Sequence, residues 1–519
     1  MAAAAKILIL ASAAAGLIVQ AWLGAREWAP LLPLTIGAIA AGFALVRFVP
    51  VWGWAPLLVT AYIYPAIFHA TREFFTFSYY AIWMGGLLGG VAAAAHPARW
   101  HVPPAWRLPL AFWALALALG WPVVAFREMN FTWASLGEYT IANSGLGGPP
   151  PVIIVTMLAA VMPQMLGILW FDALFGQFAQ KESGAFRRAI LLPLAAGLLI
   201  GSALAIYQWT VDIEFLSAHQ WAYYGRAAGG LLDGNAFGAL QGLWSSAALS
   251  LALTSGPLYF ASALFLTLLL WIGVWATGSR MALLAALIGL AFIALAGLRS
   301  RGRSNVRRLV AVTVAVIVVA AALVTLGRFG AHQRFEMDPI SRVAASLPDP
   351  NREALLEFVE FELWNRFGPF GTASVRMVKD SPAVGIGAGT FETIYPDYAF
   401  VITNGATRSH FDNAQSWYRH QLAELGLVGS LGWMLWGAVF AAFVWKAAPS
   451  RDGLVEATGV KAAIAALALI SAISMPTRNI FVSLSFWVFA FWLVKLAGEP
   501  AGPRWLAAAS GRAAAWATV

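Results

Sequence analysis

One stretch of the sequence, RSHFDNAQSWYRHQLAELGLVG at residues 408–429, has six arginine, histidine, aspartate or glutamate side chains at the start of an apolar run. Two are arginines, two are histidines, one is an aspartate and one is a glutamate. A histidine or a carboxylate can take a proton from a hydroxyl group, and an arginine can hold a phosphate by two parallel hydrogen bonds. His410 and Asp412 are therefore the candidate proton acceptors, and solvated loop residues are the alternative interpretation.

Three further residues of this stretch are expected to contact an acceptor substrate or to anchor the start of the helix. They are Gln415, Arg419 and His420. A metal site needs His, Asp, Glu or Cys residues at ligand spacing, and the chain has no H-E-x-x-H or similar pattern. We therefore expect neither metal dependence nor a cofactor.

Two other arginines stand at the beginnings of apolar runs. Arg280 follows TGS in WATGSRMALLAALIGLAF, and Arg226 precedes Asp233 and Asn235 in a glycine-rich helix entry. A guanidinium group in a partly dry site suits a phosphate or diphosphate, and the start of a helix also favours an anion. An arginine that reaches the membrane surface and a simple helix cap are the alternatives.

Three glycines, Gly385, Gly387 and Gly389, form the run GIGAG. Their spacing differs from the G-x-G-x-x-G of a dinucleotide site. We therefore interpret the run as a turn that lets the backbone pack closely against its neighbours.

The scaffold that must position these residues is a membrane bundle. Of the 519 residues, 60% are hydrophobic and 11% are charged, whereas a soluble protein carries about 25% charged residues. Apolar runs of about 20 residues recur from end to end, each long enough to cross a bilayer. Cysteine is absent, which excludes disulfides and thiolate chemistry. The net charge of +9 is typical of lysines and arginines that set topology, so nucleic acid is not an expected partner.

We expect an all-α polytopic membrane protein with about fourteen transmembrane helices. Their approximate centres are residues 13, 38, 60, 86, 116, 165, 197, 244, 267, 289, 317, 434, 468 and 488. Basic loops alternate with balanced or acidic ones, so both termini are expected in the cytoplasm. The chain then divides into helices 1–11 (residues 1–326), a long, partly helical extracytoplasmic loop (327–418), helices 12–14 (419–498) and a cytoplasmic tail (499–519). A loop of this length is expected to be functional.

Four pieces follow one another in a recognisable order. They are a glycine- and asparagine-containing helix entry, TGSR at the start of a span, MVKDSPAVGIGAGTF in the long loop, and QLAELGLVG at the next helix. Together they resemble the O-antigen ligase and O-antigen polymerase superfamily, which includes bacterial protein O-oligosaccharyltransferases. The resemblance covers roughly residues 226–436.

This resemblance implies a metal-independent, inverting glycosyltransferase. Such an enzyme moves a glycan from undecaprenyl diphosphate to a hydroxyl group at the periplasmic face of the bacterial inner membrane. It implies that Arg280 contacts the donor diphosphate, with Arg366 and Arg226 as further candidates. Other expected partners are a glycan or lipid A–core acceptor, membrane lipids and other polysaccharide-assembly proteins.

The chain departs from the family pattern at the expected base. The ligases carry His, then Asn, Ser or Gln, then nine residues and G-x-x-G. Here Gly426 and Gly429 match and Ser416 follows the pattern, but Gln415 replaces the histidine. A neutral amide does not accept a proton at pH 7, so either the base is absent or a neighbour replaces it. His410 and Asp412 lie five and three residues upstream of Gln415, and His420 lies five residues downstream. We expect His410 or Asp412 to act.

The missing histidine favours a polymerase that joins lipid-linked repeat units of O-antigen or exopolysaccharide. A ligase that attaches O-antigen to lipid A–core, or a protein O-oligosaccharyltransferase, is the alternative. A lipid or polysaccharide transporter is the alternative from another class.

Overall fold

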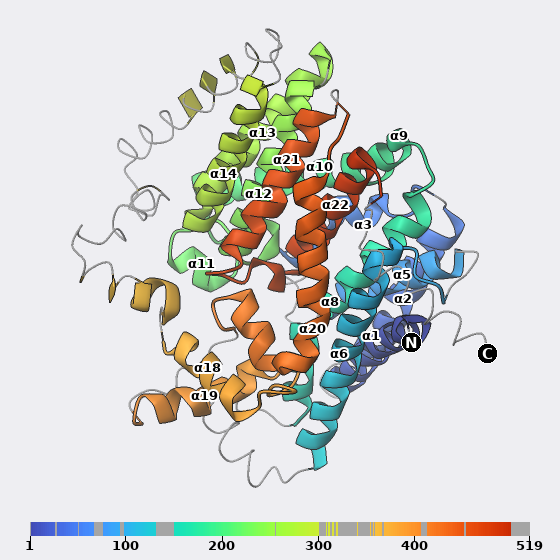
Figure 1. Cartoon of the computed structure of the whole chain (residues 1–519), viewed down its shortest axis with the longest axis vertical. Helices are drawn as coiled ribbons and strands as arrows, with labels where there is room; N and C mark the ends of the chain where they lie inside the picture. Colours follow the sequence, from blue (N-terminus) through green and yellow to red (C-terminus); the bar gives the residue numbers. More distant parts are fainter. Residues whose placement is uncertain are drawn as a thin grey trace.

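The computed structural model describes residues 2–25, 29–49, 51–66, 76–93, 98–130, 150–254, 256–299, 359–365, 368–405, 413–450 and 453–499, with isolated residues between 308 and 357. Within these ranges every regular element is a helix (Figure 1). The elements are α1 (Ala2–Gly24), α2 (Leu31–Phe48), α3 (Ala55–Thr60), α5 (Thr76–Ala93), α6 (Pro104–Asn130), α8 (Pro150–Phe178), α9 (Ser183–Phe186), η3 (Arg187–Leu191), α10 (Leu192–Thr210), α11 (His219–Tyr223), η4 (Gly229–Leu231), α12 (Gly234–Thr254), α13 (Pro257–Thr277), α14 (Arg280–Arg299), η6 (Val359–Trp364), α18 (Phe370–Asp380), α19 (Phe391–Ile402), α20 (Trp417–Lys446), α21 (Leu454–Ile470), η7 (Pro476–Arg478) and α22 (Ile480–Ala497).

Nine helical segments in these described ranges are long and apolar enough to cross a membrane. Eight are α1, α2, α6, α8, α12, α13, α20 and α22, and the ninth joins α9, η3 and α10. The predicted number of about fourteen is not reached there. Helices α3 and α21 have 6 and 17 residues, whereas a span needs about 20. The span predicted near residue 317 lies outside the described residues.

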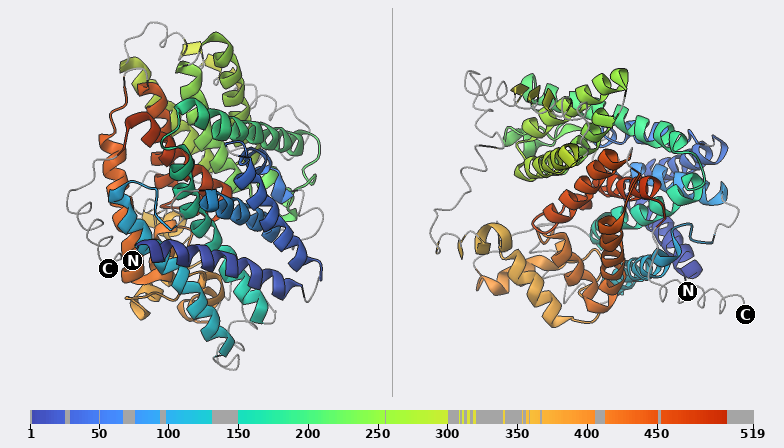
Figure 2. Two further views of the ribbon diagram at one scale, coloured as in Figure 1. Left: turned by 90° about the vertical axis from the view of Figure 1, so that its right-hand side faces the viewer. Right: turned by 45° about the horizontal axis from the view of Figure 1, so that its top comes forward.

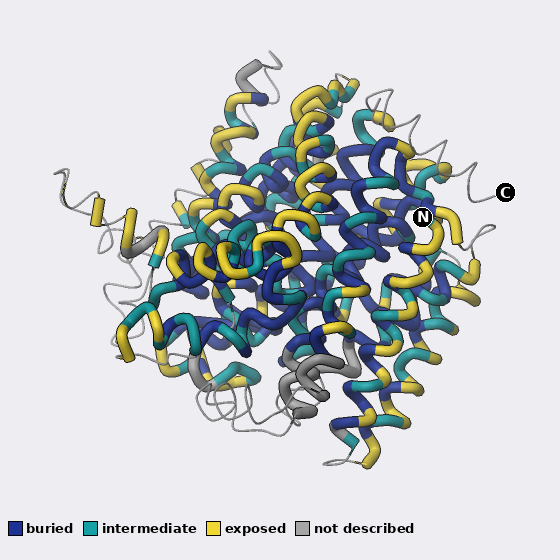
Figure 3. The backbone as a smooth tube through the Cα atoms, turned by 60° about the horizontal axis from the view of Figure 1, so that its bottom comes forward, coloured by how far each residue is buried: buried dark blue, intermediate teal, exposed yellow. Residues whose placement is uncertain are grey.

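The outer faces of the helices are apolar, as expected of a bundle surrounded by lipid. Val123, Leu192 and Phe265 are 64%, 62% and 60% exposed. Figure 3 shows such exposed positions along the outside of the helices, while the interior is buried. A helix that is apolar on its outer as well as its inner face is typical of a membrane span. The chain is thus an all-helical membrane protein.

The largest core lies where α6, α8, α20 and α22 meet, and aromatic rings fill it. Trp436 stacks on Phe440 with ring centres 4.8 Å apart, and Phe171 lies 4.7 Å from Trp487. Trp106 on α6 packs against Phe171 at 5.8 Å. Aromatic pairs at these separations add to the stabilisation that comes from burial alone. This core is the rigid frame against which α20 is positioned.

Buried ion pairs hold several of the spanning helices together. Lys6 on α1 lies 2.6 Å from Asp172 on α8, and both side chains are almost fully buried. The backbone N–H of His101 donates to the same carboxylate at 2.6 Å. Helix α1 also packs across α6 (Figure 2, left). Arg187, whose side chain is 48% exposed, donates to the buried Glu456 at 2.7 Å. A charge inside a membrane bundle needs such partners because it is costly alone.

The described part of the predicted long loop forms a small helical unit at one end of the bundle (Figure 1, lower left). Helix α18 is amphipathic, and its buried residues include Phe370, Ala373 and Met377, which recur at helical spacing. They form a separate core with Phe391 and Tyr395 of α19. The start of α20 closes this core, so the unit is joined directly to a spanning helix.

Helix α20 is bent back on itself. Gly426 has φ 63° and ψ −172°, which no helix allows, so residues 417–425 and 427–446 are two separate helical segments. Trp417 packs on Trp433 with ring centres 5.1 Å apart, and the hydroxyl of Ser430 donates to the carbonyl of Gln421. The two segments therefore lie side by side (Figure 1). The second is about 30 Å long at 1.5 Å per residue, enough to cross the hydrocarbon core.

Candidate functional site

The site begins with a joint between the GIGAG run and the bend of α20. Four backbone hydrogen bonds of 2.8 to 2.9 Å connect residues 382–387 with residues 423–428. On one side of the bend, Ile386 and Gly387 donate to Ala423 and Glu424. On the other side, the N–H groups of residues 427 and 428 donate to the carbonyls of residues 382 and 383. The loop thus satisfies the backbone groups that a broken helix leaves open.

Glycine is required at this joint for two reasons. Gly385, Gly387 and Gly389 have φ of 70°, 115° and 80°, where side chains are strained. A Cβ atom at Gly385 would lie 2.4 Å from the carbonyl of Glu424, and one at Gly389 would lie 2.3 Å from the carbonyl of Met157 on α8. The prediction that GIGAG is a close-packing turn is therefore confirmed, and its partners are α20, α6 and α8.

The joint holds a buried histidine–carboxylate pair. The Nε2 atom of His420 lies 3.3 Å from Oε1 of Glu424, one helical turn further on, and both side chains are 4% exposed. The backbone N–H of Phe391, at the start of α19, donates to the same Oε1 atom at 3.0 Å. The ring of Phe391 packs on the imidazole at 4.9 Å. These contacts assign the Nε2 proton to the bond with Glu424 and leave Nδ1 as the basic nitrogen.

Two neighbouring side chains keep unused hydrogen-bonding groups in this interior. The Nδ1 atom of His420 and both amide atoms of Gln421 are buried without a hydrogen-bond partner among the described residues. Gln421 is 1% exposed. Buried polar groups almost always have partners, so two adjacent exceptions indicate a place where a polar ligand or water binds.

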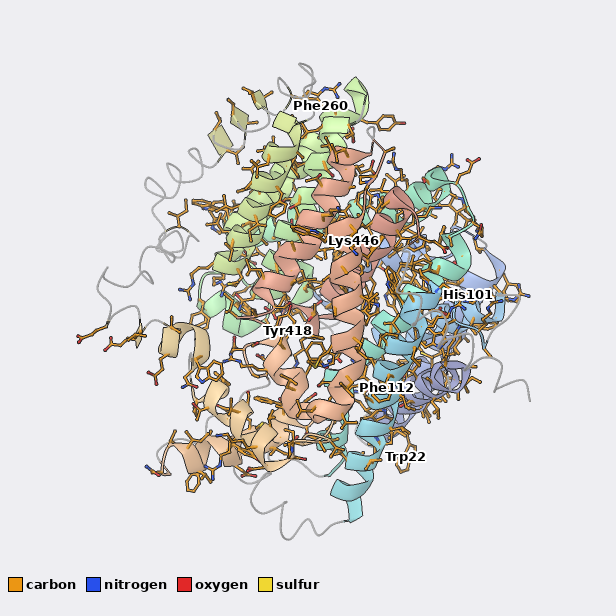
Figure 4. The ribbon with its side chains drawn as sticks, in the orientation of Figure 1. Trp22, His101, Phe112, Phe260, Tyr418 and Lys446 are labelled. Carbon is orange, nitrogen blue, oxygen red and sulfur yellow. The ribbon has the colours of Figure 1, made fainter. Side chains whose placement is uncertain are left out.

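An apolar groove reaches Glu424 of this pair from the surface. Its volume is about 440 Å³, and its walls are α6, residues 384–388 and the bend of α20. Phe112 (labelled in Figure 4) lines it on α6. Val123 and Val384 are 64% and 68% exposed at its rim, so the groove opens toward the lipid-facing surface. Glu424 is the one charged residue among the residues that line it.

The predicted residues of the helix entry lie next to this site. Gln415 has φ 52°, and its backbone N–H donates to the side chain of Asn413 at 2.8 Å. Ser416 directly precedes the first segment of α20 and is 2% exposed. Arg419 donates to the carbonyls of Trp364 and Ala414, each at 3.1 Å. His420, predicted as an acceptor or helix-entry contact, lies in the first segment of α20 and forms the buried pair with Glu424.

Of the two predicted donor-binding arginines that the structure describes, Arg226 is the more enclosed. It is 6% exposed, donates through Nε to the carbonyl of Thr277 at 2.6 Å and lies 4.6 Å from the ring of Trp221. Its Nη2 donates to Asn235 at 2.7 Å. These contacts connect the end of α13 to the start of α12. Arg280 is partly exposed at the first position of α14. The structure gives no contact between either arginine and His420.

Three predicted residues, His410, Asp412 and Arg366, lie outside the described residues, and their roles stay predictions. The sequence interpretation did not assign chemistry to Glu424, although its spacing of four residues from His420 was a readable signal. It also overlooked Arg478, which pairs with Glu392 at 3.0 Å beside the start of α19. In the part of the chain that the structure describes, no three His, Asp or Glu residues cluster as metal ligands would. No protein-family model and no curated protein sequence matches this chain.

Proposed function

We propose that this protein is a membrane glycosyltransferase that moves a glycan from undecaprenyl diphosphate to a sugar hydroxyl group. Its product is a polymer of lipid-linked repeat units, as in O-antigen or exopolysaccharide synthesis. In this proposal the chain lies in the bacterial inner membrane with both termini in the cytoplasm and the α18–α19 end in the periplasm. The observation that supports it most directly is an apolar groove on the lipid-facing surface that reaches a buried carboxylate.

The groove suits a substrate that arrives through the bilayer. Its lining is apolar apart from Glu424, and its open rim faces lipid. A polyprenyl chain can therefore enter sideways without leaving a hydrophobic environment. The polar head of such a donor would then lie close to the bend of α20. A water-soluble sugar nucleotide has no comparable use for a groove of this kind.

The His420–Glu424 pair supplies the chemistry in this proposal. The acceptor hydroxyl gives its proton to Nδ1 of His420, while Glu424 holds the Nε2 proton and stabilises the imidazolium that forms. The acceptor oxygen forms a bond to the anomeric carbon as the bond from that carbon to the diphosphate oxygen breaks. The diphosphate leaves with the electron pair, and the configuration at the anomeric carbon is inverted. Arginines stabilise the leaving anion, with Arg280 as the predicted first contact.

Two other functions have a claim. A ligase acting on lipid A–core, or a protein O-oligosaccharyltransferase, uses the same donor chemistry and differs only in its acceptor. A lipid or polysaccharide transporter is favoured by one observation, the break of α20 at Gly426, because broken spanning helices are typical of transporters.

A reconstituted assay separates these functions. Purified protein is given a lipid-linked repeat unit, with and without lipid A–core. A ladder on the carrier alone supports the polymerase, and product that appears only with core indicates a ligase. Movement of an unchanged lipid-linked glycan across a liposome membrane, with no transfer to any acceptor, would contradict the enzyme and support the transporter.

Variants test the proposed base directly. We expect His420→Gln to lower kcat by at least about 100-fold with little change in the KM for the donor, since general-base catalysis contributes roughly that much. Glu424→Gln should act in the same direction because the imidazolium loses its partner. Glu182→Gln, at an exposed position before α9, is the matched control. Normal turnover by His420→Gln would leave His410 or Asp412 as the base.

A further inference from the structure

We propose that Arg419 binds the phosphate groups of the lipid-linked donor. This inference rests on the proposed function for the identity of the ligand, whereas the anion site itself rests on the contacts of Arg419. The guanidinium lies 4.7 Å from the ring of Trp364 and donates to two backbone carbonyls at 3.1 Å. Its Nε atom is buried and has no hydrogen-bond partner among the described residues.

The charge of Arg419 is not neutralised in the described part of the chain. Arg187 is paired there with Glu456, and Arg478 with Glu392. Among the described residues, Arg419 contacts an aromatic face and donates to two neutral carbonyls. A partly enclosed cation without a counter-ion is unfavourable, and a bound anion would remove that cost. The surroundings of Arg419 therefore point to an anionic ligand.

The same contacts fix the plane of the guanidinium. Trp364 covers one face, and the two carbonyls each take one N–H, from Nη1 and from Nη2. A guanidinium has five N–H donors, so Nε–H and one donor on each terminal nitrogen remain for a ligand. A planar group with parallel N–H donors binds phosphate oxygens bidentately, which an ammonium group does not do.

Trp364 is itself held in place. Its ring lies against Gly371 of α18, where a Cβ atom would come within 2.6 Å of the ring. Gly371 thus contacts Trp364, and Trp364 contacts Arg419. Trp364 and Gly371 act as positioning residues because they reach the ligand only through the arginine.

Arg419 also stands in a useful place relative to the proposed base. It directly precedes His420, so the two side chains leave the same rigid half-helix about 100° apart. The bend at Gly426 and the joint hold that half-helix. An anion on Arg419 and a hydroxyl at His420 would therefore be oriented by one element, as a transfer reaction requires.

Binding of two probes tests the inference without any turnover. Inorganic pyrophosphate and undecaprenyl diphosphate are titrated into purified protein in detergent, with undecaprenol as the uncharged comparison. We expect Arg419→Gln to weaken binding of undecaprenyl diphosphate at least about tenfold, the usual loss for a charge-assisted hydrogen bond. Arg376→Gln, at an exposed position of α18, should bind as the wild type does, and undecaprenol should not distinguish any of these proteins.

Two further variants guard against a folding defect. Arg419→Lys keeps the charge but loses the plane, so an intermediate affinity is expected. Gly371→Ala should displace Trp364 and weaken diphosphate binding without removing a charge. If pyrophosphate binds and Arg419→Gln weakens that binding, the diphosphate head group is sufficient for recognition. If undecaprenyl diphosphate binds and pyrophosphate does not, the polyprenyl chain in the groove is needed as well.

Different results would refute the anion site at Arg419 and the proposed glycosyltransferase function. Unchanged affinity of a folded Arg419→Gln protein for undecaprenyl diphosphate overturns the anion site, even if glycan transfer is observed. Arg419-dependent binding in a protein that transfers no glycan keeps the anion site and refutes the transferase.

Discussion

Replacing Gly385 by alanine tests the joint that holds the site together. The new Cβ atom would meet the carbonyl carbon and oxygen of Glu424 at 2.4 Å and the nitrogen of Gly426 at 2.5 Å. All three are backbone atoms, so no side chain can rotate away. The left-handed φ of 70° adds about 1–2 kcal/mol. If the loop moves out, two backbone hydrogen bonds to residues 423 and 424 are lost, each worth about 1 kcal/mol.

The expected cost of Gly385→Ala is therefore about 3–4 kcal/mol in the free energy of unfolding. It is measured by reversible unfolding in mixed micelles. Gly437→Ala is the matched control, because Gly437 lies on the same α20 with open space around its Cβ position. That change should alter stability by less than about 1 kcal/mol, in the stabilising direction. A cost below about 1 kcal/mol for Gly385→Ala would refute the joint.

The joint also predicts strong coupling between its two glycines. A Cβ atom at Gly426 would lie 2.4 Å from the nitrogen of Gly385, so each substitution opens the same contact. The double variant should cost little more than the worse single variant, since neighbours that share one contact are not additive. Additive costs would mean that the two glycines act on separate structures.

Two further perturbations test other parts of the fold. Asp172→Asn leaves Lys6 buried without its counter-ion, so it should lower the free energy of unfolding in detergent by about 3–5 kcal/mol. Combining it with Lys6→Met should restore most of that loss, and a double variant as unstable as Asp172→Asn would contradict the ion pair. Burial and a hydrogen bond to Asp380 raise the pKa of Tyr398 to about 12 from 10.0, so the folded state keeps a proton that the unfolded state loses. Stability should thus be complete below about pH 10 and fall as pH rises toward 12, and Tyr398→Phe should remove that decline in melting temperature.

The spanning helices were predictable because their signal is local. An apolar run of about 20 residues needs no partner to be recognised, and helices such as α6 and α12 lie where their runs predict. Helix α3 shows the limit of that rule. The run centred near residue 60 is apolar, but the helix ends after 6 residues at Thr60. Hydropathy alone does not report where a buried chain stops being helical.

The bend of α20 could not be predicted from the sequence, for a different reason. The letters QLAELGLVG fit an unbroken apolar helix, and an isolated glycine in such a pattern is usually tolerated. What breaks the helix is a loop forty residues earlier in the chain, whose N–H and C=O groups complete both ends of the bend. Likewise, Arg419 and Trp364 are far apart in the sequence, and the fold brings them into contact. Contacts of this range leave no periodic signal in the sequence.

The bend also changes how the missing histidine is understood. In the family that the sequence resembles, the spacing from Gly426 would place the base at position 415, and Gln415 lies just before the half-helix with a left-handed φ. His420 lies five residues further on, in the first turn of the half-helix, and its partner Glu424 lies beside the bend. A base at the start of this half-helix can be carried either by the residue just before it or by a residue in its first turn. In the proposed function, the glutamine at position 415 therefore does not require a loop residue as the base, because we propose that His420, which faces the start of α19, takes that role.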